Sequence, residues 1–296
     1  MPTGIVLLDK PAGLSSNAAL QRVRRLYGAA KAGHAGSLDP LATGMLPICL
    51  DEATKIAGEI LSSRKRYRFA IALGERTATG DAEGEVIERS TVPELEPRGI
   101  AAVLAGFLGP GLQIPPMYSA LKRDGRPLYA LARAGVTVER EARPVELFEL
   151  TLEGLEARRL ELATVCSKGT YVRVLAEDIA RALGTCGHVA MLRREWVAPF
   201  EREPMHTLEA LERAAQAGEA PGPLPADAPL GHLPAVRLDA ARAERIRHGQ
   251  AVPHEAVVTG MVRLYDAQQR FMGLGASAPG EVRPRRLFAE VQAQPS

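Results

Sequence analysis

The strongest constraint on the fold of this chain is the order in which strand-like and helix-like patterns follow one another. Residues 66–73, RYRFAIAL, alternate between polar and apolar side chains, which predicts a half-buried strand. Comparable patterns predict further strands at 4–9, 143–152, 159–167 and 187–197, and helices at 15–28, 98–108, 126–135 and 171–183. These elements are interspersed without a regular strand–helix–strand rhythm. Their order therefore favours an α+β fold with a mixed sheet over a doubly wound parallel sheet.

A change in composition near residue 215 predicts two domains. Residues 215–234, AQAGEAPGPLPADAPLGHLP, are rich in alanine, proline and glycine, which is typical of a linker. After them, short strand-like runs separated by turn residues predict a small β-barrel. A chain of 296 residues has room for both parts. We therefore expect a large domain over 1–214 and a small domain over 235–296.

The charge distribution is uneven although the formal net charge is only +2. Residues 235–296 contain nine arginines and six acidic residues, so the expected small domain is basic. Basic runs such as RKRYR at 64–68 are usually a solvated face. Three cysteines are too few for a disulfide framework, no apolar run approaches the roughly 20 residues of a membrane span, and the first residues lack a secretory pattern. We therefore predict a cytoplasmic protein without a membrane partner.

The stretch GHAGSLDPLATGML at 33–46 places two ionisable side chains, His34 and Asp39, among small residues. The residues alone leave two interpretations open. Asp39 followed by Pro40 is typical of a helix start, with aspartate as the N-cap and proline at the first helical position. The alternative is a glycine-containing loop that presents a carboxylate to a ligand.

Common cofactor and metal motifs are missing from the sequence. It contains no phosphate-binding G-x-x-x-x-G-K-[ST], no G-x-G-x-x-G that opens a helix after a strand, no G-x-S-x-G, and no zinc spacing of cysteine and histidine. The remaining candidates are a carboxylate, a tyrosine and an arginine in separate segments: Asp39, Tyr67 and Arg173. Besides the N-cap interpretation of Asp39, structural interpretations stay open for the other two. Tyr67 lies on an apolar face typical of a core, and Arg173 has Glu177 one helical turn away as an ion-pair partner.

Five blocks of sequence carry a family resemblance. They are GHAGSLDPLATGML at 33–46, KRYRFAIALGERTATGDAEG at 65–84, QIPPMYSALKRDGRPLYALARAG at 113–135, CSKGTYVRVLAEDIARALG at 166–184 and HVAMLRR at 188–194. In type and order they resemble the TruB family of tRNA pseudouridine synthases, over about residues 4–200. The last segment, with RIRHGQ at 245–250, resembles the RNA-binding PUA domain. The resemblance implies a mixed, largely antiparallel sheet flanked by helices, followed by a small PUA-like barrel.

The resemblance also implies roles for particular residues. Asp39 is the implied catalytic residue, and Tyr67 and Arg173 line the site with it. Substrate-binding positions are implied for the other matching residues, which are Lys10, His34, Tyr171 and Leu192. The implied reaction converts uridine to pseudouridine, and because this is an isomerisation, it calls for no cofactor and no metal.

The implied chemistry breaks the N1–C1′ bond, turns the base over and rejoins it through C5. Asp39 either attacks C1′ or removes a proton from C2′, and the sequence leaves both routes open. An arginine within about 4–6 Å lowers the pKa of a carboxyl group by roughly 1–3 units, so we expect Arg173 to keep Asp39 ionised. We expect Tyr67 to stack on the uracil. Proton abstraction from C5 by Tyr67 is the less favoured alternative, because a free phenol has a pKa near 10.

The implied substrate is the T-arm of tRNA, at position 55 by the family's convention, with the target uridine swung out of its stack. The implied enzyme works without a guide RNA and without an obligatory protein partner. Two alternatives stay open. One is an RNA-binding or RNA-folding protein whose catalysis is incidental or lost, and the other is the guide-RNA-dependent branch of the same superfamily.

A few positions depart from the family pattern. Ala35 stands where a hydroxyl residue is expected, Asp51 where glycine is common, and Ala78 where an acidic residue is usual, while Asp81 is retained. The run LGTCGHV at 183–189 also differs from the family's glycine-rich run. None of these departures removes a proposed catalytic group.

Overall fold

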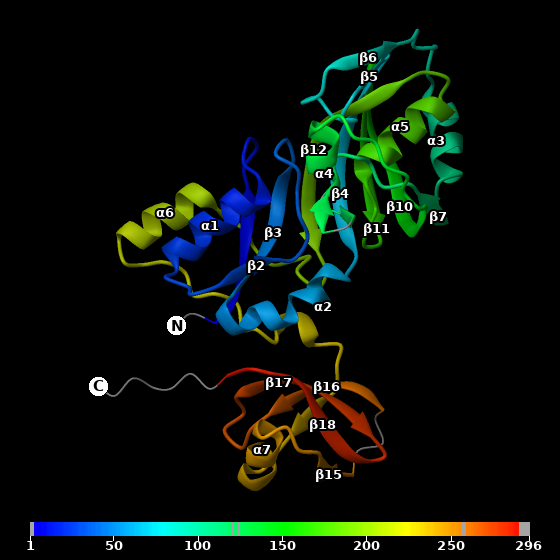
Figure 1. Cartoon of the computed structure of the whole chain (residues 1–296). Helices are drawn as coiled ribbons and strands as arrows, with labels where there is room; N and C mark the ends of the chain where they lie inside the picture. Colours follow the sequence, from blue (N-terminus) through cyan, green and yellow to red (C-terminus); the bar gives the residue numbers. More distant parts are fainter. Residues whose placement is uncertain (1–2, 120, 124, 256–258, 290–296) are drawn as a thin grey trace.

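A computed structural model describes residues 3–119, 121–123, 125–255 and 259–289 (Figure 1). The outer ends of the two expected domains, residues 1–2 and 290–296, lie outside the described part. The larger sheet has the order β13-β1-β3-β12-β4-β11-β10-β7, with β2 paired to β3. Its strands are β1 (Gly4–Lys10), β2 (Ala32–His34), β3 (Thr43–Leu50), β4 (Lys65–Leu73), β7 (Gly109–Gln113), β10 (Arg143–Glu156), β11 (Arg159–Cys166), β12 (Gly187–Val197) and β13 (His206–Thr207).

This sheet is mixed, which confirms the expected fold class. The pairs β1–β13 and β12–β3 are parallel, and the other pairs are antiparallel. The strands and helices predicted between residues 4 and 197 are present with small shifts in their bounds. The central strand β3 was not predicted. Both of its faces are buried, so its sequence does not alternate, and Pro47 lies within it.

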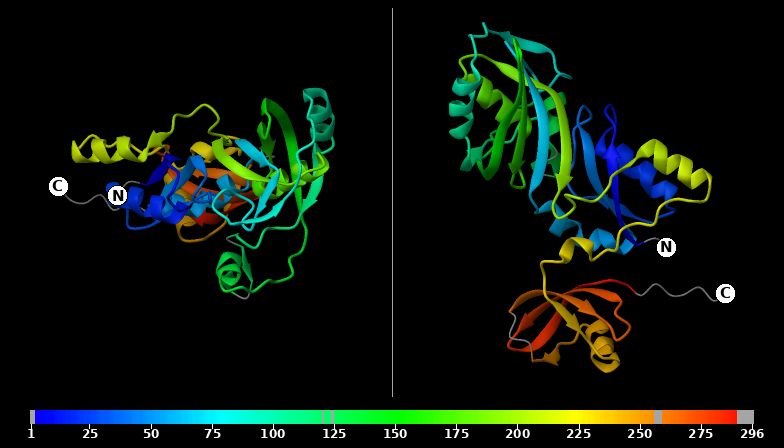
Figure 2. Two further views of the ribbon diagram at one scale, coloured as in Figure 1. Left: turned by 90° about the horizontal axis from the view of Figure 1, so that it is seen from above. Right: turned by 180° about the vertical axis from the view of Figure 1, so that it is seen from behind.

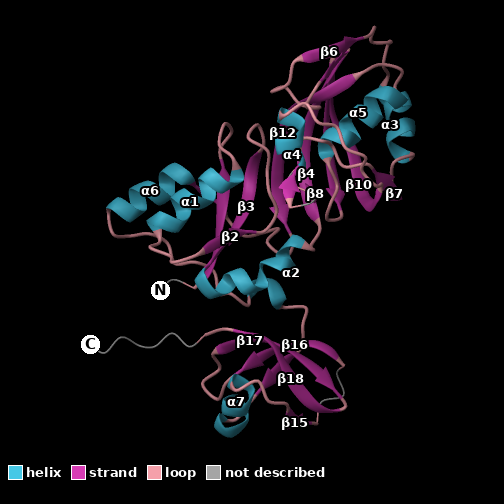
Figure 3. Cartoon of the chain, in the orientation of Figure 1, coloured by secondary structure: helices cyan, strands magenta, loops and turns pink. Residues whose placement is uncertain are grey.

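Four helices cover one face of the larger sheet (Figure 3). They are α1 (Ser16–Leu26), α3 (Pro97–Ala105), α5 (Val172–Ala182) and α6 (Leu208–Gln216). The α1 helix begins where the Ser15 hydroxyl accepts a hydrogen bond from the Ala18 N–H, and it buries Leu20 and Val23 against the sheet. The opposite face of β1 and β3 is covered by the 3-10 helix η1 (Asp51–Ile56) and by α2 (Ala57–Leu61).

Two excursions leave the larger sheet. The hairpin of β5 (Glu75–Thr77) and β6 (Val86–Arg89) follows β4. The second excursion, residues 114–142, joins β7 to β10, and we call it the arm. Within the arm lie β8 (Lys122–Arg123), β9 (Arg126–Pro127) and α4 (Leu128–Arg133). Figure 2 shows the arm reaching away from the sheet.

The C-terminal part forms a separate curled sheet below the first (Figure 1). Its order is β14-β16-β17-β18-β15. Its elements are β14 (Ala235–Arg237), α7 (Ala240–Arg247), β15 (Val252–His254), β16 (Gly260–Tyr265), β17 (Phe271–Ala278) and β18 (Gly280–Leu287). Among the described pairings β14 and β15 do not meet, so the small β-barrel that we expected here takes the form of an open, curled half-barrel.

The connecting residues 215–234 pack on the larger sheet. Leu224 exchanges two backbone hydrogen bonds with Ile5 of β1, the Tyr27 hydroxyl donates to the Pro221 carbonyl, and Leu230 is fully buried in the 3-10 helix η2 (Ala228–Leu230). No helix in the described ranges is long and apolar enough to cross a membrane.

Candidate active site

The loop that carries Asp39 is held from both sides by hydrogen bonds. The Ser16 hydroxyl accepts from the Leu38 N–H at 2.7 Å and donates to the Leu38 carbonyl at 2.8 Å. On the other side, the Lys10 ammonium and the Gly13 N–H donate to the Pro40 carbonyl. No helix begins at Asp39, so the interpretation of this residue as a helix N-cap was wrong. These contacts fix the loop backbone on both sides of Asp39 without using its carboxylate.

Lys10 lies underneath this loop and is fully buried. Its ammonium donates to the carbonyls of Pro11, Leu14 and Pro40. Burial lowers its pKa to about 8, although the charge of Asp39 acts in the opposite direction. The resemblance implied a substrate-binding position, but this arrangement leaves Lys10 no exposed surface with which to contact a substrate. It positions the loop.

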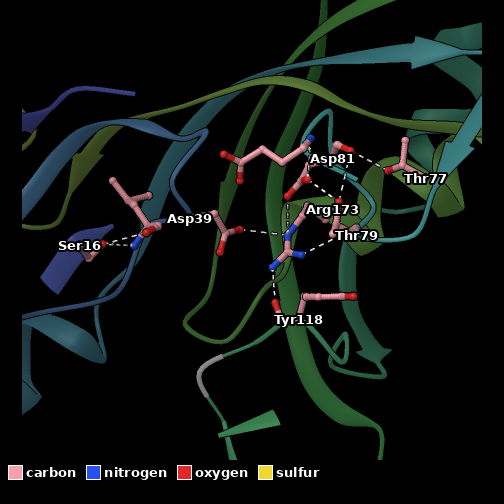
Figure 4. A network of polar contacts seen from close by, with 9 residues as sticks. Ser16, Asp39, Thr77, Thr79, Asp81, Tyr118 and Arg173 are labelled. Atoms are coloured by element: carbon pink, nitrogen blue, oxygen red, sulfur yellow. Dashed lines mark hydrogen bonds and ion pairs between the residues drawn. The ribbon is translucent and has the colours of Figure 1, made fainter. Parts of the chain in front are cut away.

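Arg173 joins three segments around Asp39 (Figure 4). Its Nε lies 3.0 Å from an oxygen of Asp39 and 3.8 Å from an oxygen of Asp81. Its two terminal nitrogens donate to the carbonyls of Thr79, at 2.8 Å, and Tyr118, at 2.6 Å. The guanidinium is therefore engaged by carboxylates and carbonyls of other segments, and not by Glu177 of its own helix.

The two aspartates differ in exposure. The Asp39 side chain is 40% exposed, whereas the side chains of Arg173 and Asp81 are 6% and 5% exposed. Burial raises the pKa of Asp39, Arg173 opposes that rise, and the negative charge of Asp81 adds to it. Arg173 thus lowers the pKa of Asp39, as expected from the sequence. Desolvation and the second carboxylate, which shares the same guanidinium, were not part of that expectation, and the net shift is upward.

A cavity of about 760 Å³ opens beside Asp39 and Arg173. This volume lies within the range of about 300–1,000 Å³ that is common for small-molecule sites. Four of the predicted residues line it together with these two: His34, Tyr67, Tyr171 and Leu192. The structure thus brings six of the seven predicted site residues to one cavity, and the exception is Lys10.

The floor of the cavity comes from the central strands. Tyr67 of β4 is 7% exposed and Leu192 of β12 is 6% exposed. Burial raises the pKa of Tyr67, which keeps the phenol protonated and disfavours it as a base. Its ring and the Leu192 side chain give the floor an apolar surface on which a base could stack.

His34 and Tyr171 lie at the walls. Nδ1 of His34 is buried and has no hydrogen-bond partner in the described part of the chain, and burial lowers the pKa of this histidine. The Tyr171 backbone is bracketed by Gln113, whose amide oxygen accepts from the Tyr171 N–H and whose amide nitrogen donates to the Tyr171 carbonyl. This bracket fixes the start of α5 and therefore the position of Arg173.

Sequence reasoning missed several positioning residues. Ser16 and Gln113 act through contacts with distant segments, and their own sequence surroundings carry no signal of this. Arg194 is 1% exposed, and it donates to the carbonyls of Met45 and Gly36 beside the Asp39 loop. A signal for Arg194 was available, because alternation on β12 places it two residues from Leu192 and on the same face.

Two of the departures from the family pattern have a structural explanation. Asp51 has φ of 47°, a conformation that glycine adopts without strain, and one of its oxygens accepts from the Lys31 N–H. Ala35 is 1% exposed and packs in the apolar cluster around Met45. In this chain the position of Ala35 faces a core, and no partner for a hydroxyl group is needed there.

Comparison with family models covers most of the chain. Residues 24–172 match the N-terminal domain of TruB family pseudouridylate synthases. Residues 173–223 match the tRNA pseudouridylate synthase B C-terminal domain, and residues 234–288 match the C-terminal model of pseudouridine synthase II TruB.

Two curated relatives are similar over nearly their whole length. A tRNA pseudouridine synthase B of Chromohalobacter salexigens is 51% identical over 289 residues, which is 96% of this chain and 94% of the relative. One from Burkholderia mallei is 49% identical over 291 residues, covering 96% of both chains. Among solved structures, a Cbf5–Nop10–Gar1 complex shares the fold, with a TM-score of 0.72 and 24% identity over 98% of this chain and 84% of the other.

Proposed function

The chain belongs to the TruB family of pseudouridine synthases, and from this premise we propose that its target is uridine 55 in the T-arm of tRNA. It is an enzyme that isomerises uridine in tRNA to pseudouridine. Relatives that are 49–51% identical over nearly the whole chain are named tRNA pseudouridine synthase B. The T-arm position, the roles of the site residues and the absence of a guide RNA are the proposed part.

The single observation that carries the catalytic assignment is the ion pair between Asp39 and Arg173 at the mouth of the cavity. Asp39 is the partly exposed carboxylate of that pair, and cleavage of the N1–C1′ bond places positive charge on the sugar. A carboxylate beside C1′ stabilises this charge, as the paired acids of glycosidases do. Asp39 then acts either by attack on C1′ or by removal of the C2′ proton. Arg173 orients the carboxylate and limits its protonation.

Tyr67 and Leu192 support the uracil while it turns. The Tyr67 ring stacks on the base, as aromatic side chains do on unstacked bases, and its raised pKa argues against a role as the C5 base. The uridine must leave the RNA stack to reach this floor, at a cost of a few kcal/mol. To His34, which lines the cavity, we assign the role of filling the space that the uridine leaves.

The stand-alone reaction is favoured over guide-RNA dependence by the comparison itself. The relatives at 49–51% identity are named as tRNA enzymes, whereas the Cbf5 complexes are less than 25% identical and share only the fold. We propose that a bare tRNA transcript is sufficient as substrate. The test is to map pseudouridine in unmodified tRNA after incubation with the purified chain. Modification at position 55 is expected, and no product without an added guide RNA or partner protein would overturn the proposal.

The catalytic assignment has its own test. Asp39→Asn is expected to bind tRNA and to lose activity by on the order of 10³-fold or more, because a group essential to the chemistry is removed. The matched control is Asp178→Asn, which changes an aspartate paired with Arg181 on the outside of α5. Single-turnover rates with saturating enzyme measure both. A near-normal rate for Asp39→Asn would refute the role of this residue.

A further inference from the structure

Two basic side chains at the rim of the cavity have no carboxylate partner among the described residues. The side chain of Arg143, the first residue of β10, lines the cavity and makes no hydrogen bond or ion pair within the described ranges. Lys168, in the turn between β11 and α5, also lines the cavity. Of the residues that the structure describes, its ammonium reaches only the hydroxyl of Ser62, at 3.5 Å. Both residues are exposed.

These two cations belong to one structural unit. The Ser167 hydroxyl accepts from the Glu146 N–H at 2.8 Å, and the Ser167 N–H donates to the Glu146 carbonyl at 2.9 Å. The start of β10 and the turn that carries Lys168 are therefore fixed to each other. Two like charges held on one rim without a counterion repel each other, and an anion between them would relieve that repulsion.

Other cations near the cavity are already engaged. The nitrogens of Lys65, Arg173 and Arg194 are hydrogen-bonded to backbone carbonyls inside the protein. On the outer face of β4, Arg66 contacts three glutamates and Arg68 contacts two. Of the lysine and arginine side chains that line the cavity, Arg143 and Lys168 are therefore the two without a carboxylate or carbonyl partner among the described residues.

A neighbouring pocket of about 380 Å³ shares Arg143 with the main cavity. Its lining also contains Arg123 and Arg140, but Glu139 and Glu141 balance these two charges. The excess positive charge of this pocket is thus a single charge, equal to that of Arg143. This balance confines the candidate anion site to the rim formed by Arg143 and Lys168.

We propose that Arg143 and Lys168 bind a backbone phosphate of the RNA strand that flanks the uridine in the cavity. The proposal rests on the proposed function, since it takes RNA as the molecule whose nucleotide enters the cavity. A phosphodiester next to that nucleotide must pass over the rim, and guanidinium and ammonium groups are the usual partners of such phosphates. The two side chains act as positioning residues that set which nucleotide of the strand lies over Asp39.

The test measures the salt dependence of tRNA binding for Arg143→Gln, Lys168→Gln and the double variant. For a single-stranded or duplex contact, each lost phosphate contact is expected to reduce the slope of log K against log salt by about 0.7–0.9. The same slope corresponds to a Kd increase of about five- to eightfold per contact at about 0.1 M salt. Because the two side chains share one phosphate, the double variant is expected to lose the slope of one phosphate contact, and each single variant no more than that. Arg66→Gln and Arg68→Gln are the matched controls, and their slopes should not change.

A chemically altered RNA locates the phosphate. A T-arm stem-loop is prepared with a neutral methylphosphonate in place of the phosphate on either side of the target uridine. One of the two replacements should weaken binding to the wild-type chain and should add nothing to the defect of the Arg143→Gln/Lys168→Gln variant. Equal losses in wild type and variant, or unchanged salt slopes, would overturn the proposal. These are binding measurements, so a wild-type chain that binds tRNA but forms no pseudouridine would instead refute the proposed function.

Discussion

At the scale of single residues, the most consequential arrangement is one guanidinium between two carboxylates. Arg173 Nε is closer to Asp39 than to Asp81, and Asp81 is almost completely buried. Asp81 is held in place by the Thr79 hydroxyl and the Glu83 N–H. Its negative charge makes ionisation of Asp39 harder and thus counteracts part of what Arg173 contributes.

This arrangement predicts a shift of the pH profile in Asp81→Asn. Because the pKa of Asp39 is raised in the wild type, its ionised fraction is lost on acidification at a pH above the ordinary aspartate value of about 3.9. Removing the Asp81 charge lowers the pKa of Asp39, so the loss of the single-turnover rate on acidification is expected to occur at a lower pH. Asp178→Asn is the control and should leave the pH of this loss unchanged. If Asp81→Asn also left it unchanged, the two carboxylates would not be coupled.

At the scale of elements, the site depends on how β3 is joined to β12. Gly44 of β3 pairs with Arg194 of β12 and has φ of +98°. A Cβ atom there would overlap the carbonyl oxygen of Arg194, which is backbone and has no room to withdraw. The Asp39 loop runs directly into β3, so a displacement at this junction changes the position of the carboxylate.

We therefore predict that Gly44→Ala destabilises the protein by about 2–5 kcal/mol, through strained backbone and steric overlap, and reduces activity even where it folds. Gly33→Ala is a matched control from the same motif. Within the part of the chain that the structure describes, a Cβ at Gly33 would meet only a Thr54 methyl group, at 3.7 Å. The expected change is below about 1 kcal/mol. Chemical denaturation of both variants measures the difference. Similar losses in the two variants would contradict the explanation by overlap.

Elements with one buried face were predictable from the sequence, and contacts between distant segments were not. The alternation of β4 and the helical spacing of α5 follow from burial on one side, so their bounds agree with expectation. β3 has no alternation because both faces are buried. The hydrogen bonds between Ser16 and Leu38 join residues that are 22 positions apart, and no local pattern signals such a contact. That Asp39, Tyr67 and Arg173 lie together was indicated by the family resemblance and not by their spacing in the sequence.

At the scale of the whole molecule, one carboxylate ties the C-terminal half-barrel to the larger sheet. Glu52 in η1 accepts from Lys31 at 3.0 Å, from Lys55 at 2.6 Å and from the Ala289 N–H at 2.6 Å. Lys55 in turn donates to the Leu287 carbonyl, and Arg286 donates to the Lys55 carbonyl. These hydrogen bonds, which we call the Glu52 network, join the half-barrel to the larger sheet in addition to the connecting segment.

The stabilisation by the Glu52 network has a defined pH dependence. Desolvation acts to raise the pKa of Glu52, but the hydrogen bonds from Lys55, Ala289 and Lys31 outweigh it and lower the pKa to about 2. A carboxyl whose pKa is depressed on folding contributes its stabilisation above the unfolded value, about 4.3, and loses it as the pH falls toward the folded value. The stabilisation by the Glu52 network is therefore fully present at neutral pH and is lost only under strongly acidic conditions.

The final prediction concerns Glu52→Gln. At neutral pH the substitution removes the charge from three hydrogen bonds and is expected to destabilise the chain by about 1–3 kcal/mol. The stability difference from wild type should shrink as the pH is lowered from about 4.3 toward 2, because protonation then neutralises the wild-type carboxyl as well. Glu281→Gln, which removes a carboxylate paired with Arg283 within the half-barrel, is the control and should show a smaller difference at neutral pH. Denaturant unfolding across pH measures both variants, and a Glu52→Gln difference that stays constant with pH would show that the Glu52 charge does not hold the two sheets together.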